Sequence, residues 1–183
     1  MRVYLLLSVI SIICLGLQFE PLHSYVEWNA TAIHSGQWWR ILTGNFTHTN
    51  FAHWAMNLIG LWFIGFIFKP SLPTLLFPLL LTSMAVGIGN LFTDMQLYAG
   101  LSGSLHGLFG YYALRESLHG RKSSGLLVFG LMAKIVWEFS FGASTVTSGL
   151  IDARVAIESH LFGAVSGLLL AYFSYWYGRN KNA

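Results

Sequence analysis

Ser102 lies among glycines in the stretch LYAGLSGSLHGLFG (residues 97–110) of a strongly apolar chain. A serine hydroxyl is a weak nucleophile at neutral pH, and a neutral imidazole can activate it by accepting its proton. Two histidines are candidates for this base: His106, four residues after Ser102, and His160, much further along the chain. We favour His160, because a side chain on a facing helix can point at Ser102, whereas an i+4 neighbour points along the same helix face. His106 is then expected to orient His160 or to stack on it.

A serine nucleophile also needs donors for the negative charge that develops on the attacked carbonyl oxygen. Ser102 is predicted to begin a helix, so its backbone N–H has no partner within that helix and lies at the positive end of the helix dipole. His53 and Asn57 are spaced i, i+4 and would share one face of another helix, from which both could donate to the same oxygen. A nucleophile, a base and oxyanion donors predict acyl transfer, of which peptide-bond hydrolysis is the form that we favour.

The elements that position these residues are predicted to be transmembrane helices. Of the 183 residues, 55% are hydrophobic and 9% are charged, compared with about a quarter charged in an ordinary soluble domain. The mean hydropathy is +0.59. Most of the apolar stretches approach the roughly 20 residues needed to cross a bilayer, and they lie at residues 3–19, 51–68, 72–92, 102–114, 126–141 and 157–177. We therefore predict an all-α polytopic membrane protein, a six-helix bundle that forms one domain over residues 1–183.

The first apolar stretch resembles the start of a signal peptide. Its exit, LQFEP, offers no cleavage site of small residues, so we expect this stretch to remain as a membrane anchor.

The distribution of positive charge predicts the orientation in the membrane. Seven positive residues fall at the ends of helices on one side: Arg2, Lys69, Arg115, Arg121, Lys122, Arg179 and Lys181. The loops on the other side contain two, Arg40 and Arg154. By the positive-inside rule both termini are cytoplasmic, and we expect the chain in the inner membrane of the cell. The candidate site residues then lie in the first turns of three helices that enter from the outer face, at roughly one depth.

Small residues predict which helices touch. Gly103 and Gly107 form a small face on the helix that begins at Ser102, which Gly110 continues, and Gly163 and Gly167 form one on the last helix. Such faces let two backbones approach closely in lipid. Because His160 lies on the same face as these last two glycines, close packing would bring it within hydrogen-bond reach of Ser102.

These motifs together resemble those of the rhomboid intramembrane serine proteases. Gly100, Ser102 and Gly103 match the family's GxSG nucleophile motif, and the spacing of His160, Gly163 and Gly167 matches its histidine motif. The segment HWAMN (residues 53–57) is similar to the HxxxN oxyanion motif, and residues 39–40 are like the WR pair of the first loop. The resemblance implies a Ser102 and His160 dyad with no third acidic member, and an oxyanion hole formed by His53, Asn57 and the Ser102 backbone. It also implies that water reaches the site from the outer side. We expect no cofactor.

Within the family, the short chain, the segments GQWWR and TGNFTHTN and the run SGSLHG look like the rhombosortase branch. That resemblance implies a membrane-anchored protein substrate, with either its transmembrane segment or a C-terminal sorting tail at the site. Such tails carry a Gly-Gly motif, an apolar helix and basic residues.

Several other interpretations of the polar residues were weighed. His48, His53, His106 and His160 could be metal ligands, but we expect no metal because no HExxH motif or carboxylate accompanies them. His23, His34 and His119 are expected to be solvated loop residues. The positive residues are scattered, which argues against a nucleic-acid partner. Residues 20–50 are expected to form an interfacial loop with its cluster of Gln37, Trp38, Trp39 and Arg40 at the headgroup boundary, and residues 142–156 a mobile cap.

Two questions stay open from the sequence. Lys134 and Glu138 are spaced i, i+4 within one predicted span, and they form either a self-contained pair or a latch that responds to substrate. A transporter or channel with a histidine proton relay is the main alternative function, and a membrane scaffold without activity is another. A relay predicts polar residues through the whole bilayer depth, whereas the polar residues here cluster near one face.

Overall fold

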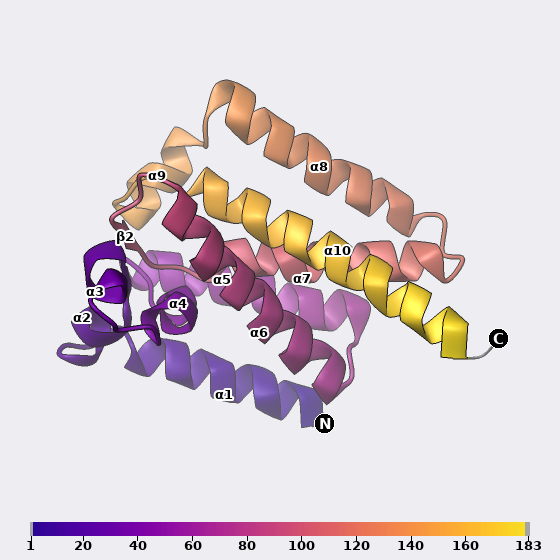
Figure 1. Cartoon of the computed structure of the whole chain (residues 1–183), viewed down its shortest axis with the longest axis horizontal. Helices are drawn as coiled ribbons and strands as arrows, with labels where there is room; N and C mark the ends of the chain where they lie inside the picture. Colours follow the sequence, from indigo (N-terminus) through magenta and orange to yellow (C-terminus); the bar gives the residue numbers. More distant parts are fainter. Residues whose placement is uncertain (1, 182–183) are drawn as a thin grey trace.

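The computed structural model describes residues 2–181, and these fold into an all-α bundle (Figure 1). The long helices are α1 (Arg2–Gly16), α5 (Phe51–Phe68), α6 (Leu72–Gly89), α7 (Ser102–Leu118), α8 (Ser124–Phe141) and α10 (Ile157–Lys181). The short elements are α2 (Leu22–Val26), β1 (Trp28–Asn29), α3 (Ala30–His34), α4 (Arg40–Thr43), η1 (Gly44–Phe46), η2 (Asn90–Phe92), β2 (Leu97–Tyr98) and α9 (Thr145–Ile151). Within residues 2–181 one long helix lies at each of the six predicted stretches, and the prediction of an all-α polytopic fold is confirmed.

Among the described residues, four segments are long and apolar enough to cross a membrane: α5, α6 continued by η2, α8 and α10. Helix α1 has 15 residues and is shorter than expected, because the chain leaves the helix at Gly16. Helix α7 has 17 residues and a more polar sequence. It contacts α5, α6, α8 and α10, so much of its surface meets protein and not lipid, and it needs fewer apolar side chains than a lipid-facing span.

The start of α1 and the end of α10 lie at the same end of the bundle in Figure 1, and the short elements α2, α3, α4 and α9 lie toward the opposite end. The loops that join α6 to α7 and α8 to α10 also lie at that opposite end, where α7 and α10 both begin. The first residues of these two helices therefore share one end of the molecule, as the sequence predicts.

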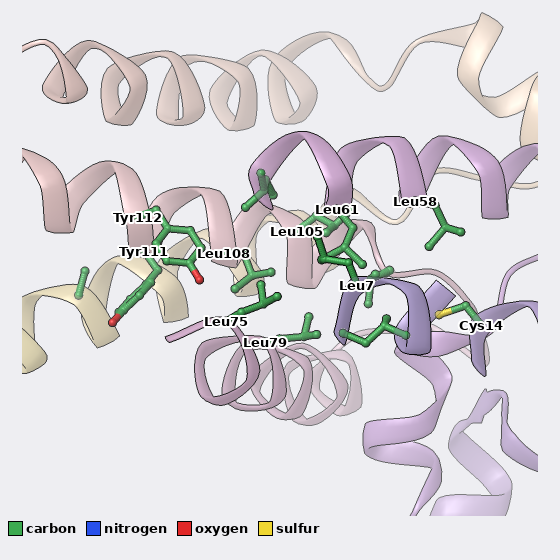
Figure 2. Close-up of a cluster of buried hydrophobic side chains, with 14 residues drawn as sticks. Leu7, Cys14, Leu58, Leu61, Leu75, Leu79, Leu105, Leu108, Tyr111 and Tyr112 are labelled. Carbon is green, nitrogen blue, oxygen red and sulfur yellow. The ribbon is translucent and has the colours of Figure 1, made fainter. Parts of the chain in front are cut away.

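Apolar side chains hold α1, α5, α6 and α7 together. Figure 2 shows leucines from the four helices that point into one cluster, including Leu7, Leu61, Leu75 and Leu108, and all four are fully buried. Burying such a side chain contributes about 1.5 to 3 kcal/mol where water is the alternative, and within lipid the gain comes from packing contacts.

Helices α7 and α10 meet in a different way, through glycine backbones. A Cβ atom placed on Gly163 would lie 1.8 Å from the carbonyl oxygen of Gly103, and one on Gly167 would lie 1.9 Å from that of Gly107. No side chain fits at either position. The predicted contact between these two glycine faces is therefore confirmed.

The segment before α5 is organised around Arg40, which is 6% exposed. Its guanidinium donates to the carbonyl oxygens of Ser24 and Glu27 at 3.0 and 2.8 Å and to the side chain of Gln37 at 2.7 Å. Its charge is thus satisfied by loop carbonyls inside the protein, and its place at the headgroup boundary stays a prediction. Trp38, by contrast, is 70% exposed, as a residue at that boundary would be.

Residues 142–156 were expected to be a mobile cap, and they contain the helix α9. The side chains of Thr49 and Asn50 donate hydrogen bonds to the carbonyl oxygens of Ile151 and Leu150 at 2.6 and 3.0 Å. These bonds attach the end of α9 to the start of α5.

Candidate active site

Ser102 is the first residue of α7 and follows a tight turn. Strand β2 pairs antiparallel with β1, and the N–H of Gly100 donates to the carbonyl oxygen of Gly44 at 3.2 Å. Gly100 has a φ of +138°, a conformation that side chains disfavour. A Cβ atom there would also lie 2.7 Å from the ring of His53. Glycine at position 100 thus lets the chain turn closely past His53 just before the nucleophile candidate.

The hydroxyl of Ser102 donates to Nε2 of His160 at 3.0 Å. His160 lies in the first turn of α10 and is 5% exposed. The glycine contact between α7 and α10 explains this distance, because Gly103 packs on Gly163 one turn after His160. Of the two histidines considered as base, His160 is the one that contacts the hydroxyl.

His106 is placed differently. Its Nδ1–H donates to the backbone carbonyl oxygen of Ser102 at 2.7 Å and does not reach the hydroxyl. Its ring stacks on that of His160, with centroids 4.1 Å apart and an interplanar angle of 16°. The expected stacking of His106 on His160 is present.

Glu138 of α8 adds a carboxylate to the pair. Nδ1–H of His160 donates to Glu138 Oε2 at 2.9 Å, and Lys134 donates to Glu138 Oε1 at 2.5 Å. The expectation of a pair with no third acidic member did not include this contact of His160 with a carboxylate. The i, i+4 spacing correctly indicates a pair between Lys134 and Glu138, but the pair is not self-contained, because a carboxylate has two oxygens and the second one faces His160.

The Glu138 carboxylate also bears on metal binding, because no metal was expected on the ground that no carboxylate accompanies the histidines. His106, Glu138 and His160 each offer a ligand atom within 4.8 Å of the others, so a carboxylate does accompany the histidines. The geometry does not suit an ion, however. A metal must lie in the plane of each imidazole that binds it, and two nearly parallel rings stacked 4.1 Å apart share no such point.

His53 and Asn57 lie one turn apart on α5, and both line the same cavity as Ser102. Nδ2 of Asn57 is buried and has no hydrogen-bond partner among residues 2–181. The backbone N–H of Thr49 is directed at Nδ1 of His53 at 3.5 Å, and the hydroxyl of Thr49 lies 3.1 Å from the same atom. When Nδ1 accepts the bond from the Thr49 N–H, the ring proton lies on Nε2, which is the nitrogen nearer to Gly100.

Two cavities reach Ser102 from different directions. The first has a volume of about 580 Å³ and is lined by the side chains of Ser102, His160, His53 and Asn57, together with the exposed charged residues Asp94 and Arg154. The second, of about 480 Å³, lies between α5 and α8 and is lined mainly by apolar residues, Phe63, Leu126 and Leu131 among them. Ser102, His106 and Asn57 line both cavities.

The four other histidines lie outside the candidate site. His48 is fully buried, and its ring meets that of His53 edge-on with centroids 5.1 Å apart. Burial, with His53 and His23 nearby, lowers the pKa of His48 to about 3, so its ring is neutral at physiological pH. His23 was expected to be a solvated loop residue, but its Nε2–H donates to the carbonyl oxygen of His48 at 3.1 Å. His34 and His119 are exposed, as expected.

Sequence reasoning missed the link from Glu138 to His160 and the contact of Thr49 with His53. The position of Glu138 within a predicted span indicated that it needs a partner. Lys134, four residues before it, already provided one, so no second partner was sought. Thr49 carried no signal, since its contact depends on the loop conformation before α5.

The chain is similar to known proteins of one family. The family model for the Rhomboid domain matches residues 35–177. The chain is 28% identical over 171 residues to the "Putative rhomboid protease YdcA" of Bacillus subtilis (strain 168), covering 83% of this chain and 78% of the relative. It is 27% identical over 164 residues to the "Rhomboid protease GlpG" of Yersinia pseudotuberculosis serotype I (strain IP32953), covering 86% of this chain and 55% of the relative. A GlpG of Yersinia pestis matches to the same extent, so the chain spans about half the length of these GlpG relatives.

The family match covers more than half of the chain and includes every candidate site residue discussed above. The chain therefore belongs to the rhomboid family of intramembrane serine proteases.

Proposed function

We propose that the chain hydrolyses peptide bonds in membrane-anchored proteins, with Ser102 as nucleophile and His160 as general base. The observation that carries this proposal is the 3.0 Å hydrogen bond between the Ser102 hydroxyl and Nε2 of His160. His160 accepts the hydroxyl proton while Oγ attacks the carbonyl carbon, and it then returns that proton to the leaving amine. Water, activated by the same imidazole, hydrolyses the acyl-enzyme and frees Ser102.

The oxyanion that forms in this reaction needs donors already in place. We assign three: the backbone N–H of Ser102, Nδ2 of Asn57 and Nε2–H of His53. The buried and unpartnered state of Asn57 Nδ2 within residues 2–181 supports this role, because an orphaned donor beside a nucleophile is otherwise a net cost.

The two cavities suggest how both substrates arrive. The apolar cavity between α5 and α8 suits a lipid-embedded segment of a protein substrate. The cavity with Asp94 and Arg154 at exposed positions suits water, which hydrolysis consumes. A transmembrane segment or C-terminal tail of a membrane-anchored protein could thus meet water at Ser102, and the lipid bilayer is the second partner.

The placement in the cell follows from charge. Arg2, Arg179 and Lys181 lie at the end of the bundle that holds both termini, away from Ser102. By the positive-inside rule this end faces the cytoplasm, so the proposed active site opens toward the outer side of a bacterial inner membrane. Residues 1–183 would act as one domain.

Within the family we propose the rhombosortase branch, on the strength of the sequence segments that resemble it, GQWWR, TGNFTHTN and SGSLHG. The substrate class would then be secreted proteins with a C-terminal Gly-Gly sorting tail. A histidine relay for protons is less well supported, because Ser102, His53, Asn57 and His160 gather at one end of the bundle.

The test is cleavage of a membrane-tethered reporter in proteoliposomes. The reporter carries a C-terminal tail with a Gly-Gly motif, an apolar helix and basic residues, and a second reporter carries the same tail with Gly-Gly replaced by Val-Val. We expect cleavage by the wild type, none by S102A, a loss of about 1,000-fold or more in H160A, and a smaller loss in H106A. Cleavage by H160A with none by H106A would contradict the assigned base, and equal cleavage of both reporters would contradict the branch.

A further inference from the structure

We infer that Glu138 is a positioning residue for His160, so that a carboxylate from α8 completes a serine–histidine–glutamate arrangement. This inference rests on the proposed roles of Ser102 and His160. The geometry is specific: Ser102 contacts Nε2 of His160, and Glu138 contacts the opposite ring nitrogen, Nδ1, at 2.9 Å. Glu138 is 8% exposed, so water competes little for this bond.

The carboxylate fixes the tautomer of the base. An ionised carboxylate only accepts hydrogen bonds, so Nδ1 of His160 must carry the proton that it donates to Glu138. In a neutral imidazole the lone pair then lies on Nε2, where it can accept the proton of the Ser102 hydroxyl. When His160 takes up that proton and becomes positively charged, the adjacent carboxylate stabilises it.

Lys134 binds one oxygen of the Glu138 carboxylate and leaves the other for His160. Its ammonium group holds Oε1, which leaves Oε2 for His160. The Lys134 side chain is 49% exposed, so it compensates the buried carboxylate from the edge of the protein.

Glu138 could instead serve only to attach α8 to α10. The buried residues of α8 are Ser124, Leu131, Ile135 and Glu138. Glu138 is the charged one among them and the one that meets the proposed base. A packing role and a positioning role predict different orders of activity among variants of Glu138. Substitution of Lys134 separates the two roles.

The decisive comparison is E138Q with E138M, two side chains of similar size. In E138Q the ammonium of Lys134 attracts the amide oxygen, which turns the amide NH₂ toward His160. That NH₂ donates to Nδ1 and forces the ring proton onto Nε2, where it blocks acceptance from Ser102. In E138M neither tautomer is imposed, and a share of His160 keeps its lone pair on Nε2. The double variant K134M/E138Q frees the amide to turn its oxygen toward Nδ1.

The measurement is the second-order rate of labelling by a fluorophosphonate probe, in detergent, for variants that keep the wild-type elution volume and melting curve. We expect labelling to fall about 10-fold in E138M and about 1,000-fold in E138Q. K134M/E138Q should recover to the level of E138M or above, and E138D should exceed E138M because it keeps a carboxylate.

Two results overturn the inference: E138Q labelling as fast as E138M, or both labelling within twofold of the wild type. If E138Q fails to fold, the pair of E138M and K134M/E138Q decides, and slower labelling in the double variant rejects the inference. Failure of the proposed function looks different, because wild-type labelling would then be absent or unchanged in S102A.

Discussion

The two faces of α7 are held by their neighbours in contrasting ways. One face carries Leu105, Leu108 and Tyr112, which pack against side chains of α1, α5 and α6 (Figure 2). The other carries Gly103 and Gly107, whose backbones touch α10 directly. Side-chain packing tolerates small shifts, because leucines can change rotamer, whereas backbone contact fixes the separation of two helices. The face that requires a 3.0 Å hydrogen bond between Ser102 and His160 is the one built from glycine.

Glycine suits a catalytic arrangement in lipid because it fixes the positions of two neighbouring helices. Close backbones bring the first turns of α7 and α10 together without a long side chain between them, so short side chains such as serine and histidine can meet. The leucine face supplies stability and the glycine face supplies position. If this division is correct, substitutions on the two faces should affect different measurements.

The leucine face is tested by Leu108→Ala. Leu108 is fully buried, and its truncation leaves a cavity that should cost about 2 to 5 kcal/mol in the free energy of unfolding. Fluorophosphonate labelling per folded molecule should stay within about twofold of the wild type, because the α7–α10 contact is untouched. Denaturation in mixed micelles gives the first value, and Leu81→Ala, at a 53% exposed position of α6, is the control. A loss of labelling larger than the loss of folded protein would contradict the division.

The proposed oxyanion hole is tested by Asn57→Ala, on helix α5. Removing one oxyanion donor should lower turnover of the tethered reporter about 100-fold. Stability should fall little or rise, because the variant removes a buried amide nitrogen that has no partner among the described residues. Ile59→Ala, at a 69% exposed position of the same helix, is the matched control. Unchanged turnover in Asn57→Ala would remove this residue from the proposed oxyanion hole.

Gly163→Ala tests the contact itself. The added methyl group would lie 1.8 Å from the Gly103 carbonyl oxygen, so the helices must separate, at a cost of about 1 to 3 kcal/mol. Unlike Leu108→Ala, this variant should also slow labelling of the molecules that remain folded, because it moves His160 away from Ser102. Gly178→Ala is the control in the same helix, since nothing lies within 4 Å of its Cβ position. Equal behaviour of the two alanine variants would mean that close contact is unnecessary.

The last expected effect concerns pH and the buried His48. Its pKa is about 3 in the folded protein and about 6.5 in an unfolded chain, so between these values the unfolded state binds more protons. Folding stability should therefore fall as the pH drops from about 6.5 toward 3. In His48→Gln the slope should be shallower by about 1.4 kcal/mol per pH unit across that window. An unchanged slope in His48→Gln would show that His48 is protonated as easily in the folded protein as in the unfolded chain.

Much of this architecture could be predicted from residue spacing. The six long helices and the contact between Gly103 and Gly163 follow from one-dimensional patterns, because hydropathy and small-residue spacing act within single helices. The stacking of His106 on His160 was expected from the resemblance to the rhomboid family. The extension of α7 to Leu118 was missed because Arg115, Glu116 and Ser117 are polar and interrupt the apolar stretch, although they continue the helix.

The features that could not be predicted depend on contacts between distant segments. Arg40 is buried because loop carbonyls of Ser24 and Glu27 converge on it, and no spacing in the sequence encodes that convergence. Glu138 had a satisfactory partner in Lys134 four residues away, so nothing pointed to its second oxygen. When a side chain has a suitable partner nearby in the sequence, a second partner that is distant in the sequence cannot be predicted.

The account depends most on the claim that Ser102 is a nucleophile activated by His160. The most direct measurement is mass spectrometry of the protein after reaction with a fluorophosphonate probe, to locate the modified residue. The account predicts one adduct on Ser102 in the wild type, almost none in H160A and none in S102A. An adduct on another serine, such as the neighbouring Ser104, or full modification of Ser102 in H160A would contradict it.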